Sequence, residues 1–183
     1  MPHMIGKHVM LREYRQDDFS CIRKWVNDRE TTKYLSSIFW FPQSEADTGE
    51  FLGRAMRSAP NAAFFVIADV NDESYIGQLD IFEINWKIRQ GKLGMVIGDE
   101  GKRGKGYGTE ALKLLINYAF GILSLERLEL EVYDENKRAA RCYEKAGFMF
   151  EGTRRRAAMV NGKFTDVHMM SVIKSDWENR KPD

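Results

Sequence analysis

The residues with the clearest chemical potential form a glycine-rich basic stretch, GKRGKGYGTE, at positions 101–110. Glycine tolerates positive φ, so such a stretch can turn several backbone N–H groups toward one side. The apolar residues that follow, from Ala111 to Phe120, have helical spacing. A helix N-terminus adds unpaired N–H groups and the positive end of a dipole. Because these features together make a site for phosphate, the sequence predicts a phosphorylated ligand.

Two well-known phosphate loops do not fit this stretch. A P-loop requires GxxxxGK followed by Ser or Thr, and no frame provides it. A dinucleotide-binding fingerprint, GxGxxG or GxGxxA, would begin at Gly104 and end at position 109, where this chain has Thr instead of Gly or Ala. Such a fingerprint also follows the first strand of its fold, whereas this stretch lies past the middle of the chain. The remaining pattern, RGKGYG from Arg103 to Gly108, is short enough to be a plain surface turn. The surrounding elements must therefore decide between a phosphate site and a turn.

The composition narrows the classes of function. A length of 183 residues favours one domain, 1–183, and a net charge of +1 argues against nucleic acid as a main partner. Two cysteines, Cys21 and Cys142, and three scattered histidines do not form a metal-binding pattern, so we expect no metal. No signal-peptide-like segment or long apolar run is found, so we expect a cytoplasmic protein with no membrane partner.

The patterns along the chain predict the elements that must hold the glycine-rich stretch. Strands are expected where β-formers cluster or alternate, and helices where apolar residues recur every three or four positions after a capping residue. Strands are predicted at 8–14, 62–69, 75–84, 92–97, 128–133, 148–160 and 163–173. Helices are predicted to begin at Asp17 or Asp18, at a capping box over 44–47, at Thr109 and at Asn136.

This order of elements predicts a mixed α/β domain. The strand before the glycine-rich stretch and the strand after its helix form a parallel crossover pair, and ligands in open sheets bind at the carboxyl ends of such strands. Asn161 and Gly162 predict a type I′ turn, which joins the last two strands into a hairpin. The phosphate site is thus expected at one end of a sheet.

Several separated motifs, taken together, resemble the GNAT superfamily of acetyltransferases. The similarity runs from Gly94 to Phe148, and the order of the elements agrees over nearly the whole chain. The segments VMLR at 9–12 and NGKFTDV at 161–167 resemble the branch that holds ribosomal-protein N-terminal acetyltransferases and spermidine acetyltransferases. The matching central pieces are MVIGD (95–99), RGKGYGTEAL (103–112), DENKRA (134–139) and YEKAGF (143–148).

The resemblance implies a fold and a cosubstrate. The GNAT fold has a twisted, mostly antiparallel sheet of about seven strands with one splayed parallel pair, often bulged in its first strand, and about four flanking helices. Acetyl-CoA is the implied ligand, with no metal. Its pyrophosphate would meet the N–H groups of the loop, and its pantetheine arm would pair with the strand before the loop. The implied cofactor-binding residues are Met95, Val96, Ile97, Arg103, Gly104, Lys105, Gly106, Tyr107, Gly108, Thr109 and Asn136.

The resemblance also implies which residues move protons during acetyl transfer to an amine, which we expect to occur by direct attack. Tyr143 matches a tyrosine near the sulfur of CoA, so it is the predicted general acid; packing of the helix 137–146 is the alternative. Glu83 resembles a carboxylate that lines the amine site of spermidine-acetylating relatives, so it is the predicted proton acceptor; an exposed strand-end carboxylate is the alternative. Asp80 is assigned no role. Lys92 stands where many relatives have Glu, which is a departure from the family pattern.

The acceptor is expected to be a primary amine, either a small molecule or a peptide N-terminus. The segment with Tyr34, Phe39 and Trp40 shapes the acceptor pocket in this family, although core packing accounts for at least one of these residues. A polyamine acetyltransferase is the first alternative, and it would need an acidic pocket that includes Glu83. A non-catalytic acyl-CoA-binding regulatory module is the alternative from another class. Homodimers are common in this branch of the family.

Overall fold

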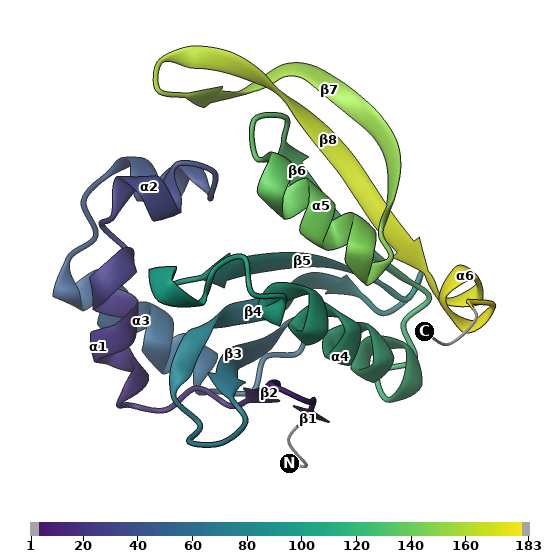
Figure 1. Cartoon of the computed structure of the whole chain (residues 1–183), viewed down its shortest axis with the longest axis horizontal. Helices are drawn as coiled ribbons and strands as arrows, with labels where there is room; N and C mark the ends of the chain where they lie inside the picture. Colours follow the sequence, from purple (N-terminus) through teal and green to yellow (C-terminus); the bar gives the residue numbers. More distant parts are fainter. Residues whose placement is uncertain (1–3, 181–183) are drawn as a thin grey trace.

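The computed structural model of the chain describes residues 4–180 and is built around one twisted sheet of eight strands (Figure 1). The strands follow the spatial order β1-β2-β3-β4-β5-β6-β8-β7. Within residues 4–180, β5 and β6 are the only neighbouring strands that run parallel. The strands are β1 (Met4–Ile5), β2 (Val9–Arg12), β3 (Ala63–Asp69), β4 (Tyr75–Asn85), β5 (Gln90–Ile97), β6 (Arg127–Tyr133), β7 (Met149–Val160) and β8 (Lys163–Ile173).

Helices cover the two faces of the sheet unequally. α4 and α5 pack on one face in the larger core, which takes in strands from β2 to β8. α1 and α3 cover mainly the β2–β4 part of the other face, in a second core. The helices are α1 (Asp18–Trp25), α2 (Arg29–Thr32), α3 (Glu45–Ala55), α4 (Tyr107–Gly121), α5 (Lys137–Ala146) and α6 (Lys174–Glu178), and the 3-10 turns are η1 (Ser37–Trp40) and η2 (Glu100–Lys102). None of the helices described combines the length and the apolar character that a membrane crossing requires.

The predicted fold class is confirmed, with differences in the short elements. The sheet has eight strands rather than about seven because the two-residue β1 joins its edge, and α2 and α6 are additional short helices. Such lengths give too few residues for periodicity to be read. The predicted capping box at Ser44 is present, with both reciprocal hydrogen bonds to Asp47. Asn161 and Gly162 have φ of +50° and +76°, as a type I′ turn requires.

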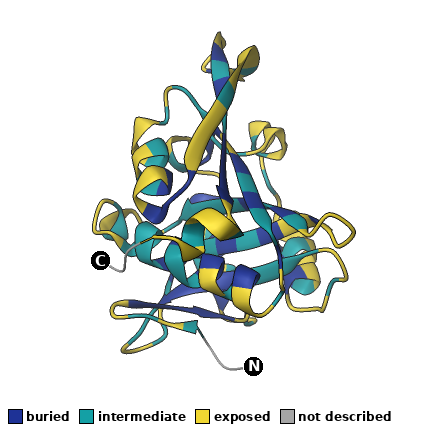
Figure 2. Cartoon of the chain, turned by 90° about the vertical axis from the view of Figure 1, so that its right-hand side faces the viewer, coloured by how far each residue is buried: buried dark blue, intermediate teal, exposed yellow. Residues whose placement is uncertain are grey.

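The hairpin of β7 and β8 extends beyond the rest of the molecule (Figure 2). β7 is an edge strand with mostly exposed side chains, and its pairing with β8 shifts register twice along its length. The hairpin tip contacts the body through Arg29 of α2, whose guanidinium donates a hydrogen bond to Asn161 Oδ1 at 3.0 Å. The tip therefore lies against the α2 side of the molecule.

The two parallel strands diverge soon after they begin. β5 and β6 form three residue pairs, which end at Lys92 and Glu129. This divergence confirms the splayed pair. Among residues 4–180, the backbone edge of β5 from Leu93 to Ile97 has no strand partner on the β6 side. The bulge expected in this strand lies instead in β4, between Phe82 and Asn85, where β4 has one residue more than β5. The sheet therefore opens on the β6 side of β5.

A buried ion pair ties β2 to the start of α1. The side chains of Arg12 and Asp18 are each 4% exposed, and two guanidinium nitrogens donate to the two carboxylate oxygens at 2.8 and 2.9 Å. The N–H of Arg15 donates to Asp18 Oδ2 at 2.8 Å, so this carboxylate also holds the turn that enters α1. Asp17, the other predicted cap, makes no capping hydrogen bond.

Asp18→Asn is expected to lower the free energy of unfolding by about 3 kcal/mol, because it leaves the buried guanidinium of Arg12 without its counter-charge. The matched control is Asp17→Asn, whose exposed side chain predicts a change below about 0.5 kcal/mol. Urea unfolding at pH 7 measures both variants. Equal transition midpoints for the two variants would contradict a stabilising role for this pair.

Candidate functional site

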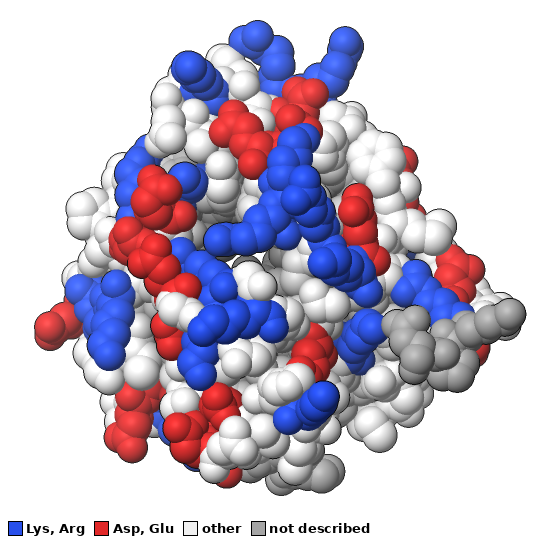
Figure 3. Space-filling view, in the orientation of Figure 1, with Lys and Arg blue, Asp and Glu red and all other residues white. Residues whose placement is uncertain are grey.

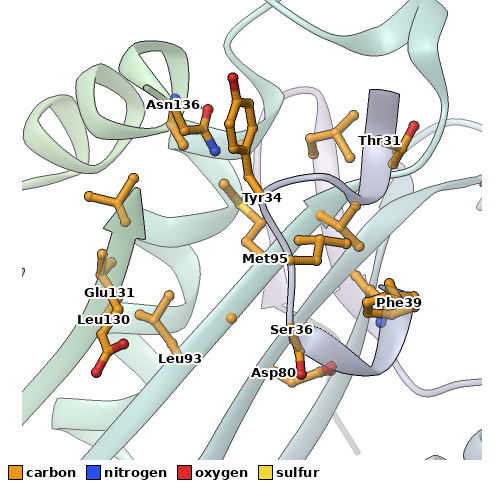
Figure 4. A pocket seen from close by; sticks show the side chains of 18 of the residues that line it. Thr31, Tyr34, Ser36, Phe39, Asp80, Leu93, Met95, Leu130, Glu131 and Asn136 are labelled. Carbon is orange, nitrogen blue, oxygen red and sulfur yellow. Dashed lines mark hydrogen bonds between the residues drawn. The ribbon is translucent and has the colours of Figure 1, made fainter. Parts of the chain in front are cut away.

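A cleft of about 1500 Å³ opens where β5 and β6 separate. In Figure 4, Leu93 and Met95 of β5 lie at its base, Asn136 lies at the start of α5, and the segment from Tyr34 to Phe39 crosses in front. Figure 3 shows basic side chains on both sides of a hollow on this face of the molecule. The basic residues that line the cleft are Arg54, Lys92, Lys102, Arg103, Arg127, Arg138, Arg141 and Lys145.

The glycine-rich loop presents backbone N–H groups to the cleft. Gly104 and Gly106 have φ of +74° and +88°, and a β-carbon at either position would meet nothing within 4 Å. Gly106 is the N-cap of α4, so the first helical N–H groups, those of Tyr107, Gly108 and Thr109, have no acceptor within the helix. All five residues line the cleft. Open space thus lies before a row of donors at the positive end of a helix dipole, which suits a phosphate group.

Arg103 holds the loop in place rather than facing the cleft with a free side chain. Its guanidinium donates to the carbonyl oxygen of Ile97 at 3.0 Å and to Thr31 Oγ1 at 2.6 Å. Its backbone N–H donates to the carbonyl oxygen of Glu100 at 3.2 Å. The row of N–H groups left for a phosphate therefore begins at Gly104, one residue later than the sequence analysis expected.

The two lysines of the loop differ in their surroundings. Lys102 Nζ lies 3.1 Å from Asp69 Oδ2 and 5.6 Å from the centre of the Tyr107 ring. Asp69 raises the pKa of Lys102 through this hydrogen bond, so the ammonium stays charged but is already paired. Lys105 is exposed and lies outside the cleft lining, unlike the other predicted site residues. A role for Lys105 in binding the cosubstrate stays a prediction.

The free edge of β5 continues the row of donors from the loop. Met95, Val96 and Ile97 all line the cleft. The start of α4 packs closely against this strand, because a β-carbon at Gly108 would lie 3.1 Å from Met95 Cε and 3.2 Å from Cys142 Sγ. A loop with unpaired N–H groups and an unpaired strand edge are thus adjacent. The residues present fit a ligand in which a diphosphate is joined to an extended amide-containing arm, as in acetyl-CoA.

Tyr143 lies between the cleft and the core. The residue is 6% exposed, and it belongs to the cleft lining. Its ring packs edge-on against the ring of Phe148, with 5.9 Å between the two ring centres. Burial raises the pKa of Tyr143 well above that of an ordinary phenol, and the neighbouring Cys142 adds to the shift. The phenol therefore keeps its proton over the working pH range. Packing and cleft lining both hold for this residue, and its role as an acid stays a prediction.

Asn136 caps α5 and also lines the cleft. Its Oδ1 accepts a hydrogen bond from the N–H of Ala139 at 3.3 Å, which caps α5. The residue also lines the cleft, and Figure 4 shows it at the start of this helix on the opposite side from Thr31. One side chain can thus fix the helix and face a ligand.

Glu83 lies in the bulge of β4 and is paired with a cation. Its φ is +52°, its side chain is 63% exposed, and its Oε2 lies 2.8 Å from Lys92 Nζ. Glu83 raises the pKa of Lys92 through this hydrogen bond. Both residues line the cleft, but the charge of Glu83 is already matched by the lysine that departs from the family pattern. A role for Glu83 as the proton acceptor stays a prediction.

The structure adds a cleft residue that the sequence analysis set aside. Asp80, near the middle of β4, lines the cleft and is partly exposed to it. Burial raises the pKa of its carboxyl group to about 7. The signal that could have found it is an acidic residue inside a largely apolar strand, since a carboxylate there must either have a partner or titrate at higher pH.

A loop of unpaired N–H groups beside two splayed strands is the arrangement that the sequence analysis expected from the resemblance to the GNAT superfamily. Residues 8–149 match the acetyltransferase (GNAT) domain family. The chain belongs to this family, and it is an acetyl-CoA-dependent N-acetyltransferase.

Relatives of known activity match over nearly their whole length. A spermidine N(1)-acetyltransferase from Vibrio cholerae serotype O1 is 29% identical over 178 residues, which cover 96% of this chain and 99% of the relative. A spermidine N(1)-acetyltransferase from Escherichia coli K12 is 26% identical, over 95% of this chain and 91% of the relative. The crystal structure of spermidine N-acetyltransferase from Vibrio cholerae in complex with CoA and spermine has a TM-score of 0.81, with 27% identity over 93% of this chain and 98% of that one.

Gly106→Ala is expected to weaken CoA binding by about tenfold, because alanine disfavours the positive φ that aims the loop N–H groups and costs about 1.4 kcal/mol there. The matched control is Gly121→Ala at the other end of α4, where a β-carbon also meets nothing within 4 Å. Calorimetric titration with CoA measures both variants. Equal dissociation constants for Gly106→Ala and the wild type would contradict a phosphate site in this loop.

Proposed function

We propose that this acetyltransferase acts on a primary amine that attacks the acetyl thioester directly, with no acyl-enzyme. The observation that carries the proposal is that one cleft brings together the phosphate loop, the free edge of β5 and Tyr143. Acetyl-CoA supplies an activated acetyl group. The residues of the chain then have three tasks: to stabilise charge on the carbonyl oxygen, to give a proton to the leaving thiolate and to remove a proton from the amine.

The free edge of β5 is the proposed source of the donor for the carbonyl oxygen. In the part of the chain that the structure describes, the backbone from Met95 to Ile97 has no strand partner on the β6 side. An N–H group held on a sheet strand needs no reorganisation when charge develops next to it. One such donor is worth roughly 3–4 kcal/mol in other enzymes that stabilise an oxyanion. The same edge can thus position the arm of the cosubstrate and stabilise the reacting oxygen.

Tyr143 is the proposed proton donor to the leaving thiolate. It comes from α5, and the same cleft is lined by Gly108 at the start of α4 and by Met95 of β5. Because burial raises its pKa, the phenol is fully protonated when the thiolate forms. The raised pKa keeps this proton in place and makes the phenol a weaker acid, so its transfer depends on the hydroxyl lying next to the thiolate as the thiolate forms.

Tyr143→Phe is expected to lower kcat about 100-fold, because a positioned general acid contributes on this order or more. KM for acetyl-CoA and the melting temperature should change little, since the phenyl ring keeps its packing against Phe148. Detection of the released thiol measures the rate. Tyr118→Phe, which removes a hydroxyl from outside the cleft lining, is the control. An unchanged kcat in Tyr143→Phe would remove this residue from the mechanism.

Polyamines are the second candidate class of acceptor. The observation that favours them is the similarity over nearly the whole chain to spermidine acetyltransferases, one of them solved with CoA and spermine. In this chain Lys92 pairs with Glu83, the carboxylate that the polyamine alternative requires. The acceptor must therefore be decided by measurement among polyamines, peptide N-termini and simple alkyl amines.

An amine panel with acetyl-CoA is expected to show thiol release with at least one primary amine and none with the matching tertiary amine. Spermidine, spermine, a peptide with a free N-terminus and an alkyl monoamine cover the proposed classes. A higher kcat/KM for spermidine than for the peptide would select the polyamine class. Tight binding of CoA without turnover of any amine would contradict the proposal and favour a regulatory module that binds acyl-CoA.

A further inference from the structure

Asp80 occupies a position from which a carboxylate can reach the acceptor. It pairs in the sheet with Phe64 of β3 and with Gly94 of β5, so it lies beside the strand whose free edge faces the opening. Gly94 has no side chain to lie over the carboxylate. Figure 4 shows Asp80 on the sheet side of the cleft, with the segment that carries Tyr34 and Ser36 crossing in front of it. Its strand neighbours Leu79 and Ile81 belong to the core that α4 covers, so Asp80 lies on the other face of the sheet, which the segment with Tyr34 and Ser36 crosses.

Asp80 differs from the other strand carboxylates of the cleft in having no cationic partner. Glu83 is paired with Lys92 at 2.8 Å. Arg127 pairs with Glu129 and Glu151. Arg154 pairs with Glu131. Among the described residues, no salt bridge involves Asp80. The strand carboxylates that line the cleft are Asp80, Glu83, Glu129, Glu131 and Glu151.

The hydrogen bonds of Asp80 leave one of its oxygens free. Its Oδ1 accepts from the hydroxyl of Tyr14 at 3.2 Å and from the N–H of Phe65 at 3.1 Å. Its Oδ2 accepts no hydrogen bond from any residue between 4 and 180. Every buried side-chain oxygen in this range has a hydrogen-bond partner, so Oδ2 is not a buried atom. Oδ2 is therefore open to the cleft, and a charged amine is the ligand that such an oxygen would bind.

The groups around Asp80 leave its carboxyl to titrate near neutral pH. Burial raises its pKa to about 7, while the hydrogen bonds from Phe65 and Tyr14 lower it in part. The titratable groups that face it are Tyr14 and Tyr75, both with pKa values raised mainly by burial. Asp18, next to Tyr14, is neutralised by Arg12. A base that titrates near the working pH is the kind that removes protons efficiently.

We propose that Asp80 binds the ammonium group of the acceptor through Oδ2 and takes one proton from it, which frees the nitrogen lone pair for attack. This inference rests on the proposed acetylation of a primary amine. An R–NH₃⁺ group and the Asp80 carboxylate become R–NH₂ and a carboxylic acid. The nitrogen then forms the C–N bond as the C–S bond breaks, the second amine proton passes to solvent, and the thiolate takes one proton from Tyr143, which regains a proton from solvent. Asp80 later returns its proton to solvent.

The first test is Asp80→Asn, with Asp72→Asn in the exposed β3–β4 turn as the matched control. With the best acceptor at pH 8, kcat/KM is expected to fall about 100-fold in Asp80→Asn and to stay at the wild-type value in Asp72→Asn. Wild-type kcat/KM should decrease below pH 7 as Asp80 is protonated, and this decrease should be absent in Asp80→Asn. CoA affinity should be the same in both variants.

Tyr14→Phe provides a second test that leaves the carboxylate in place. The Tyr14 hydroxyl donates to the ionised carboxylate and so lowers its pKa, so its removal should move the acidic limb of the kcat/KM profile to higher pH. A structural role for Asp80 predicts no such movement. A limb that stays at the wild-type pH in Tyr14→Phe would overturn the proposal.

Stability distinguishes a catalytic carboxylate from a structural one. Because the folded-state pKa of Asp80 is raised above the unfolded value of about 3.9, its contribution to stability is present below pH 4 and lost as pH rises through 7. At pH 8, Asp80→Asn should therefore melt no lower than the wild type. A lower melting temperature with unchanged kcat/KM would mark a structural residue and overturn the proposal.

Two further outcomes separate this inference from its rivals. If Glu83→Gln removes the acidic limb and Asp80→Asn keeps it, Glu83 is the proton acceptor and the present assignment is wrong. If the wild type binds CoA but acetylates no amine, the proposed function itself fails. If amines are acetylated equally well by Asp80→Asn, only the role of Asp80 fails.

Discussion

The structure depends on two parallel strands that stop pairing after three residue pairs. Beyond Lys92 and Glu129, β5 and β6 separate, so backbone groups that a sheet normally satisfies are left for water or a ligand. The sheet is continuous on either side of this opening, through β4 and through β8, which keeps the two edges in fixed positions. The close contact of Gly108 with Met95 and Cys142 fixes the start of α4 against the same opening. The N–H groups of the glycine-rich loop and the free edge of β5 are therefore held next to each other.

The segment that carries α2 is coupled to the glycine-rich loop through Arg103. Its guanidinium contacts the carbonyl of Ile97, where β5 ends, and the hydroxyl of Thr31 in α2. Asp28 caps α2 through two backbone N–H groups, so Thr31 is itself held in place. The residue that the sequence presents as a phosphate ligand thus joins the glycine-rich loop to α2, at the edge of the cleft. Its charge still contributes to the electrostatic field around this loop.

The sequence predicts most of the fold because local chemistry and periodicity agree over long elements. The type I′ turn at Asn161 and the capping box at Ser44 are read from a few residues each, and both are confirmed. The glycine-rich loop is likewise read from one short contiguous stretch. The charge pairs of the cleft are different, because they join residues that are distant in the chain or brought together by a bulge. The pairing of Glu83 with Lys92 depends on the register shift in β4, which no local pattern predicts.

The edge strand β7 has a consequence for the behaviour of the protein in concentrated solution. In the described part of the chain, one edge of this twelve-residue strand pairs with no other strand, so it could serve as a template for a strand of another molecule and seed aggregation. Two register shifts bend this edge, and the second falls between Arg154 and Ala158, where Arg156 has a φ of +51°. Three consecutive arginines add like charge at the same place. Curvature and mutual repulsion therefore oppose fibril-like stacking along a strand that the fold leaves uncovered.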